Sequence, residues 1–155
     1  MVTDQVFRGY FQTSDYSYWE GRDGLPIQLL PVGEMEVKAQ VARPALHEVV
    51  PAGSVYRIHG AAWAGEAAVS RIQVSTDGGR RWKAARWIGE GRRHAWRLWE
   101  YEWRTPARAG LYSVMARAVD DQGRGQPMRR DPNRGSYLIT QVLPIEVEVR
   151  RVRGS

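Results

Sequence analysis

Short alternating segments that end at turn signals restrict the fold of this chain more than any other feature of its sequence. In VSRIQVST, Ile72 and Val74 alternate with Arg71 and Gln73, which is typical of a strand with one buried and one solvated face. Seven such segments, bounded by Pro, Gly or Asp, cover residues 36–41, 55–64, 69–76, 80–87, 95–104, 111–120 and 143–152. This spacing predicts an all-β chain, an immunoglobulin-like β-sandwich of about seven strands.

The first 35 residues have a different texture. They are rich in aromatic residues, Gly and Pro, as in GYFQTSDYSYWEGRDGLP, and show neither a helical nor an alternating period. We therefore expect residues 1–35 to form an extended N-terminal lead-in that packs against something else. We expect residues 36–152 to form the sandwich and residues 153–155 to be a tail.

Composition restricts the kinds of site that the chain can carry. Its 155 residues contain no cysteine, which excludes disulfides, thiolate metal ligands and a cysteine nucleophile. His47, His59 and His94 lie in different segments, without metal-ligand spacing. The net charge is +6, but the arginines are scattered among apolar residues, which favours a solvated basic surface over a nucleic-acid interface. We therefore expect no nucleic-acid partner. No apolar run approaches the roughly 18 residues of a membrane-spanning helix, so we also expect no membrane partner.

The segment VSTDGGRRW, residues 74–82, predicts a tight turn between two strands. Its consecutive glycines supply the positive φ angles that a short hairpin needs. The pattern S-x-D-G-G-x-x-W is close to the Asp-box of sialidase-like β-propellers, but it occurs once and the chain is too short for a propeller. Asp77 is therefore interpreted as a turn former. A free-standing sandwich that binds glycans through exposed tryptophans is kept as the alternative function.

The strand residues offer little catalytic chemistry. Glu100 and Glu102 share one strand face, where ion pairing with Arg97 or Arg104 is favoured over paired-carboxylate catalysis. Six tryptophans between positions 63 and 103 suit the core, a protein interface or a sugar-stacking platform. The chain alone does not look like a complete enzyme.

Four motifs occur in order along the predicted strands: GAAWAG at 60–65, VSTDGGRRW at 74–82, AWRLW at 95–99 and the turn from Ala118 to Pro127. Together they resemble the C-terminal dimerisation domain of sulfite oxidase-type molybdenum-cofactor oxidoreductases. The lead-in motifs GYFQTSDY (9–16) and LPVGEMEVKAQVARP (30–44) resemble the segment that leaves the molybdenum domain in that family, with Ala39 where serine is common.

This resemblance implies that the chain is part of a larger oxidoreductase. A molybdopterin-binding domain with a molybdenum-ligating cysteine would precede residues 1–35, so this chain would bind no cofactor and would be inactive alone. The implied partners are a second copy of the chain, which makes a homodimer, and the upstream molybdenum domain. The parent would pass its electrons to a cytochrome or a haem group.

The resemblance also implies site residues. Arg134, in the N-R-G segment 133–135, stands where the family has an arginine in N-x-R-G that reaches the substrate anion pocket. A guanidinium suits this role because it is permanently charged and can hold an oxyanion with two parallel hydrogen bonds. For a two-fold interface built on one sheet, the candidate anchors are Trp87, Trp96, Trp99 and Trp103.

Overall fold

The computed structural model describes residues 5, 7–21, 26–92 and 94–151, and its main body is a sandwich of two β-sheets. The predicted tail, 153–155, lies outside the described residues. The sandwich strands are β3 (Lys38–Arg43), β4 (Val49–Pro51), β5 (Val55–Trp63), β6 (Val69–Ser75), β7 (Lys83–Ala84), β8 (Arg86–Ile88), β9 (Arg97–Arg104), β10 (Gly110–Asp120) and β11 (Ile145–Arg150).

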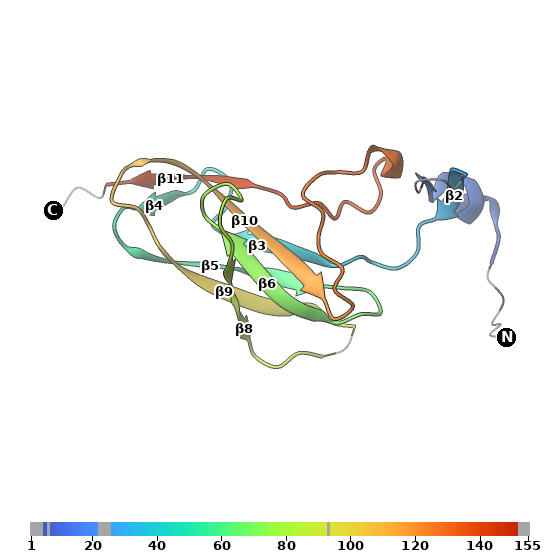
Figure 1. Cartoon of the computed structure of the whole chain (residues 1–155), viewed down its shortest axis with the longest axis horizontal. Coiled ribbons are helices and arrows are strands. Elements are labelled where there is room, and N and C mark those ends of the chain that lie inside the picture. The colour runs from blue at the N-terminus through green and yellow to red at the C-terminus, as the bar shows by residue number, and fades with distance from the viewer. Residues whose placement is uncertain (1–4, 6, 22–25, 93, 152–155) are drawn as a thin grey trace.

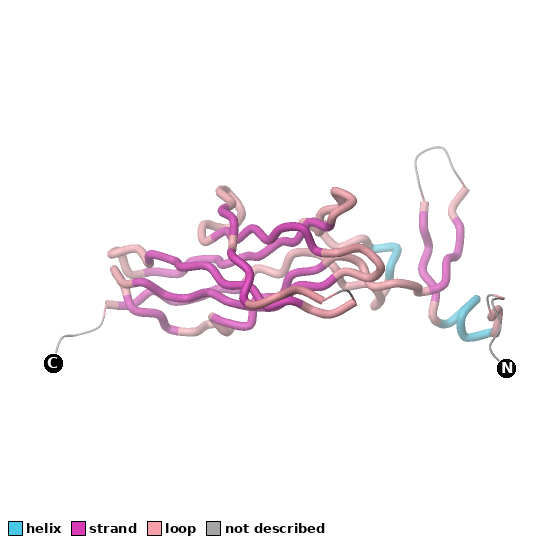
Figure 2. Tube along the Cα trace, turned by 90° about the horizontal axis from the view of Figure 1, so that it is seen from below, coloured by secondary structure: helices cyan, strands magenta, loops and turns pink. Residues whose placement is uncertain are grey.

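The two sheets differ in size. The larger has the order β4-β11-β10-β6-β7 and the smaller the order β3-β5-β9-β8. All neighbouring strands are antiparallel except β4 and β11, which pair in parallel. Strand β10 connects the two halves of its sheet: its residues 110–114 pair with β11, and its residues 115–120 pair with β6. Figures 1 and 2 show the layers face to face, which confirms the predicted all-β sandwich.

One predicted strand is divided between the two sheets. The alternation over residues 80–87 predicts one continuous strand, but Lys83–Ala84 pairs with β6 and Arg86–Ile88 pairs with β9. The chain therefore crosses from one sheet to the other near Ala85. Alternation reports which face a side chain occupies, whereas the neighbouring strand is chosen by tertiary pairing. Strand β4 has three residues, which is too short to show a period, so the sequence pattern does not predict it. Its pairing with β11 comes from tertiary contacts.

The core lies between the sheets and consists mainly of branched aliphatic side chains around two tryptophans. Trp99 has no exposed surface and Trp103 is 4% exposed. The opposing sheet contributes side chains at alternate positions, among them Ile72, Val74, Val114, Val147 and Val149. These positions are the inward half of each strand's period, as the sequence pattern predicts.

The lead-in projects from one end of the sandwich, and the last strand, β11, runs toward the opposite end (Figure 1). It is not wholly extended: a π-helical turn (Phe11–Asp15) precedes a hairpin of β1 (Ser17–Glu20) and β2 (Gln28–Pro31). The Tyr137 hydroxyl donates to the Asp15 carbonyl at 3.1 Å and so ties this segment to the sandwich loops. Among its described residues, the large apolar side chains that are exposed are Phe7, Tyr10, Phe11, Tyr16, Trp19, Ile27, Leu29 and Met35.

A buried aspartate shapes the turn after β10. The Asp120 carboxylate accepts from the Gln122 amide at 3.0 Å and from the Arg124 amide and Nε at 2.8 and 2.7 Å. Burial alone would raise the pKa of this carboxyl, since it disfavours the charged form. The Arg124 charge and the amide donors outweigh burial and hold the pKa of Asp120 below its usual range.

Replacing this carboxylate is expected to make stability depend less on pH. A lowered folded-state pKa stabilises the fold above the unfolded value of about 3.9, and this contribution is lost as the pH falls through the folded value. Asp120→Asn should therefore unfold about 1–3 kcal/mol more easily at pH 7, and the deficit should shrink below about pH 4. Urea unfolding at both pH values measures this, with the exposed neighbour Asp121→Asn as control. An equal deficit at pH 7 and pH 3 would contradict the assignment.

Candidate functional site

The Asp-Gly-Gly turn is a structural device. The Ser75 hydroxyl donates to Asp77 Oδ1 at 2.8 Å, and the Arg81 amide donates to the same oxygen at 2.9 Å. The Arg81 amide and the Ser75 hydroxyl hold the pKa of the Asp77 carboxyl below its usual range. Gly78 and Gly79 have φ of 72° and 88°, which L side chains rarely adopt. The carboxylate organises its own loop, as a turn former does.

No metal centre is found among the residues that the structure describes, since no group of three or more His, Asp or Glu side chains could hold an ion. His47 is 3.5 Å from Glu146, while His59 lies on β5 and His94 in the β8–β9 loop. In the described part of the chain, no helix is long and apolar enough to cross a membrane.

Glu100 is ion-paired, as the sequence predicts, but with other arginines. Its carboxylate lies 2.8 Å from Arg86 and 3.4 Å from Arg57, and its side chain is 9% exposed. Both arginines come from neighbouring strands on the outer face of the smaller sheet. Arg97 points to the opposite face because it is three residues away in a period of two. Its guanidinium stacks 4.4 Å from the centroid of the Trp87 ring.

Arg134 lies at the end of a short 3₁₀ turn (Pro132–Arg134) that Asp131 caps by accepting from the Asn133 amide at 2.9 Å. Its Nη1 is 2.5 Å from Glu36 Oε1, and its Nε is 3.4 Å from Asp131 Oδ2. Burial would lower the pKa of the guanidinium, but Glu36 and Asp131 outweigh it and raise the pKa. Carboxylates of the same chain therefore hold this charge in place.

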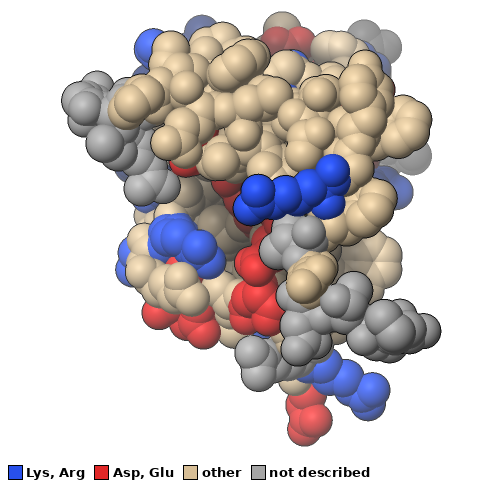
Figure 3. Space-filling model, turned by 90° about the vertical axis from the view of Figure 1, so that its right-hand side faces the viewer, with Lys and Arg blue, Asp and Glu red and all other residues tan. Residues whose placement is uncertain are grey.

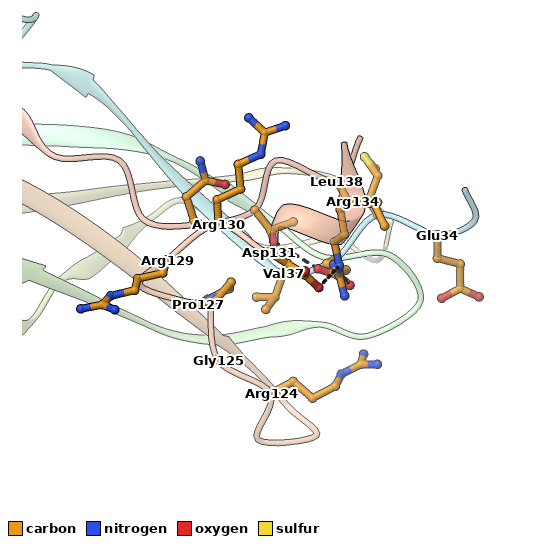
Figure 4. Close-up of a pocket in the computed structure, with 14 residues that line it drawn as sticks. Glu34, Val37, Arg124, Gly125, Pro127, Arg129, Arg130, Asp131, Arg134 and Leu138 are labelled. Carbon is orange, nitrogen blue, oxygen red and sulfur yellow. Dashed lines mark hydrogen bonds and ion pairs between the residues drawn. The ribbon is translucent and has the colours of Figure 1, made fainter. Parts of the chain in front are cut away.

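A cavity of about 380 Å³ adjoins Arg134 (Figure 4). Arg124, Arg129 and Arg130 also line it, together with Glu34 and Glu36. Figure 3 views the end of the molecule that carries the lead-in, where basic side chains flank a hollow with acidic ones in it. The side chain of Arg134 is 19% exposed, so it reaches this space only in part. The arrangement is a mixed-charge hollow rather than a purely basic pocket.

The four candidate tryptophans do not lie on one surface. Trp99 and Trp103 occupy the core, because their positions in β9 face the opposing sheet. Trp87 is half-buried against that core. Trp96 is 72% exposed, next to Leu98 at 52% and Ile88 at 40%. Only Trp96 presents most of its ring to solvent, so it and its two neighbours form an outer-face cluster (Ile88, Trp96, Leu98).

The smaller sheet has a partly open edge. Strand β8 covers β9 only from Leu98 to Glu100, and no described strand pairs beyond that point. The Thr105 amide donates to the Ser54 carbonyl at 2.9 Å, on the β5 side. Since backbone groups alternate in direction along a strand, Glu102 and Arg104 direct their N–H and C=O groups to the open edge. A groove of about 680 Å³ runs beside it, bounded by the hairpin 76–83.

Comparison with known proteins connects this fold to one family. A family model described as the Mo-co oxidoreductase dimerisation domain matches residues 30–134. The chain belongs to this family. The dimerisation domain is 35% identical to the sulfite oxidase of Gallus gallus over an alignment of 127 residues that covers 78% of this chain and 26% of that protein. It is 34% identical to the mitochondrial sulfite oxidase of Homo sapiens, over 72% of this chain and 24% of that one.

The dimerisation domain thus spans about a quarter of the curated relatives that it matches. A solved structure, the sulfane dehydrogenase SoxCD from Paracoccus pantotrophus, has a similar fold with a TM-score of 0.72 and 20% identity. That similarity covers 96% of this chain and 40% of the other. The resemblance inferred from the four motifs is confirmed. The glycan-binding alternative is not favoured.

Sequence reasoning missed two features that bear on assembly. Nothing in the pattern shows that β8 is three residues long and leaves half of β9 uncovered. Nor does the pattern show that Glu36 holds Arg134, since they are 98 positions apart. The acidic residue before β3 and the N-R-G loop are both visible in the sequence, but their contact needs the fold.

Proposed function

We propose that this domain holds two subunits of a molybdenum-cofactor oxidoreductase together. The match of residues 30–134 to the dimerisation-domain family carries the proposal. A two-fold contact requires the same surface on both copies, and the sandwich supplies a rigid support for it. The dimer would involve the smaller sheet, where both the outer-face cluster and the open β9 edge lie.

Of the four tryptophans, Trp96 is the one that can contact a second copy with an exposed ring. Trp87 would contribute through its uncovered part. Trp99 and Trp103 would support the interface from within the core, because they hold β9 in position. This division follows from the exposed fractions of the four side chains.

The molybdenum cofactor belongs to a different part of the parent protein. This chain has no cysteine to ligate molybdenum, and its described residues include no metal-binding group. Without a cysteine, the chain has no thiolate of the kind that the resemblance implies as the molybdenum ligand. We propose that residues 1–35 leave an upstream molybdopterin-binding domain and that residues 36–152 form the dimerisation unit. The exposed aromatic side chains of the lead-in would pack against that domain, because water is a poor solvent for them.

The substrate and electron partner of the parent are proposed from the relatives. The curated relatives are sulfite oxidases, so we propose a sulfite-like anion as the substrate. The resemblance to the family is the basis for proposing a cytochrome or a haem group as the electron acceptor. Arg134 would contribute to the anion pocket. Its raised pKa keeps it charged at any physiological pH, and the cavity beside it holds further arginines.

Removing this charge is expected to weaken substrate binding in the parent enzyme. Arg134→Gln should raise KM for the anion about 10-fold or more, since a charged hydrogen bond contributes about 1.5–3 kcal/mol. Glu36→Gln breaks the same ion pair but retains the guanidinium, so it serves as the matched control. It should lower the stability of the fold and leave KM within about threefold. Equal effects of both variants on KM would mean that Arg134 acts only through the fold.

The dimerisation role is tested by asking whether the chain can make another protein dimeric. Fusing the chain to a protein known to be monomeric should make the fusion dimeric, as measured by light scattering after gel filtration. The monomeric protein alone is the control. A fusion that stays monomeric at high concentration would argue against the proposal.

A further inference from the structure

The uncovered part of β9 is a strand edge with a defined hydrogen-bonding pattern. Glu102 and Arg104 each direct one N–H and one C=O outward, while Trp103 directs its own toward β5. Exposed edges of this kind pair readily with another strand, which makes them either a hazard or a docking site. The edge is three residues long, from Glu102 to Arg104, because β8 covers Glu100 and Pro106 has no N–H to donate.

We infer that two copies of the domain join along this edge, antiparallel, with Glu102 of each copy opposite Arg104 of the other. The inference rests on the proposed dimerisation function and names the surface that performs it. The two smaller sheets would then form one continuous sheet across the dimer.

The register follows from which backbone groups are free. Antiparallel strands form hydrogen bonds between residues whose groups face one another, so only Glu102 and Arg104 can take part. Pairing Glu102 with Glu102 of the second copy would set Arg104 against Glu100, which β8 already covers. Pairing Arg104 with Arg104 would set Glu102 against Pro106, which lacks a donor. Only the crossed register uses both free residues of both copies, with Trp103 facing Trp103 at the two-fold axis.

Charge favours the same register. The side chains of Glu102 and Arg104 are exposed and share the outer face of the sheet, since they are two residues apart. The crossed register therefore places an acid opposite a base twice across the axis. Both slipped registers place like charges opposite one another, which is destabilising. The edge is complementary to itself in one arrangement and repels itself in the others.

The groove beside the edge enlarges the contact. A three-residue ladder buries less surface than the roughly 1,200 Å² of a specific interface, so neighbouring side chains must contribute. The groove is bounded by Leu111, which is 66% exposed, and by Arg80 and Lys83 of the hairpin. These side chains lie where the second copy would approach.

Charge reversal tests the pairing directly. Sedimentation of the whole chain should show that Glu102→Arg and Arg104→Glu each raise the dimer Kd about 10-fold or more. The double variant, Glu102→Arg with Arg104→Glu, should return Kd to within about threefold of the original, because the opposed charges are complementary again. Glu90→Arg, which makes the same charge change in the loop after β8, should leave Kd unchanged.

Introduced cysteines test the register, since the chain has no cysteine of its own. A Glu102→Cys chain mixed with an Arg104→Cys chain should form a disulfide on mild oxidation, because opposed residues lie within bonding range. Neither variant alone should form one, since the identical positions lie two residues apart along the strands. Cross-linking of either variant with itself would overturn the register.

The outcomes distinguish failure of the β9-edge interface from failure of the proposed dimerisation function. If the original chain is dimeric and the charge reversals leave Kd unchanged, the edge is not the interface, although the domain still dimerises. Loss of the dimer in Trp96→Ala together with neutral charge reversals would place the contact on the outer-face cluster instead. If the original chain is a monomer at every concentration, the dimerisation function itself fails.

Discussion

Trp99→Ala is expected to lower the free energy of unfolding by about 3–5 kcal/mol, the range for removing a large aromatic side chain from a core. Trp99 has no exposed surface and lies in the centre of β9, opposite Gly60 on one side and Trp87 on the other. Its loss would leave a cavity that branched aliphatic neighbours cannot fill. Urea unfolding at a fixed chain concentration measures the effect.

Trp96→Ala is the matched control, because it removes the same kind of side chain three positions earlier, just before β9 begins. Trp96 is 72% exposed, so the change in the free energy of unfolding should stay within about 0.5 kcal/mol when the chain is monomeric. A loss at Trp96 as large as that at Trp99 would contradict the assignment of Trp96 to the surface and Trp99 to the core.

Gly60→Ala is expected to cost about 3 kcal/mol, the upper end of the range for overpacking. A Cβ at this position would lie 1.9 Å from the Gln40 carbonyl oxygen and 2.7 Å from Cζ2 of Trp99. Because Gly60 belongs to a central strand, relief would require β3 and β5 to separate or the Trp99 ring to turn. Thermal unfolding should show a correspondingly lower Tm.

Gly33→Ala provides the comparison for this substitution. Apart from its own backbone and its two chain neighbours, no heavy atom lies within 4 Å of a Cβ at Gly33, so the added methyl group meets open space. We expect its Tm to match the original chain within about one degree or to rise slightly, since alanine restricts the unfolded chain. Equal losses at positions 33 and 60 would show that close packing of β3 on β5 is not what requires glycine.

The sequence predicts most of the sandwich because alternating apolar and polar residues indicate which side chains of a strand are buried. Segments 55–64 and 69–76 correspond to β5 (Val55–Trp63) and β6 (Val69–Ser75) almost residue for residue. The same rule fails at 80–87, where one alternating run is divided between two sheets. It also fails in the lead-in, where a hairpin forms without a clear period. Pairing partners and short irregular strands are decided by tertiary contacts.

The candidate site was less accessible to sequence reasoning. Tryptophan content alone could not separate Trp96 from Trp99, since a shift of one residue exchanges the faces of a strand. The N-R-G motif located Arg134, but not the Glu36 carboxylate that holds it. The open edge at Glu102 and Arg104 depends on where β8 ends, which composition and period do not encode. Family motifs identify the domain, whereas the residues on its surfaces depend on how the strands pair and pack.

Sedimentation velocity of the 155-residue chain over a wide concentration range measures directly whether the domain dimerises. We expect a reversible equilibrium between a 17.7 kDa monomer and a species of twice that mass, with the dimer dominant at high concentration. A single 17.7 kDa species at every concentration would contradict it.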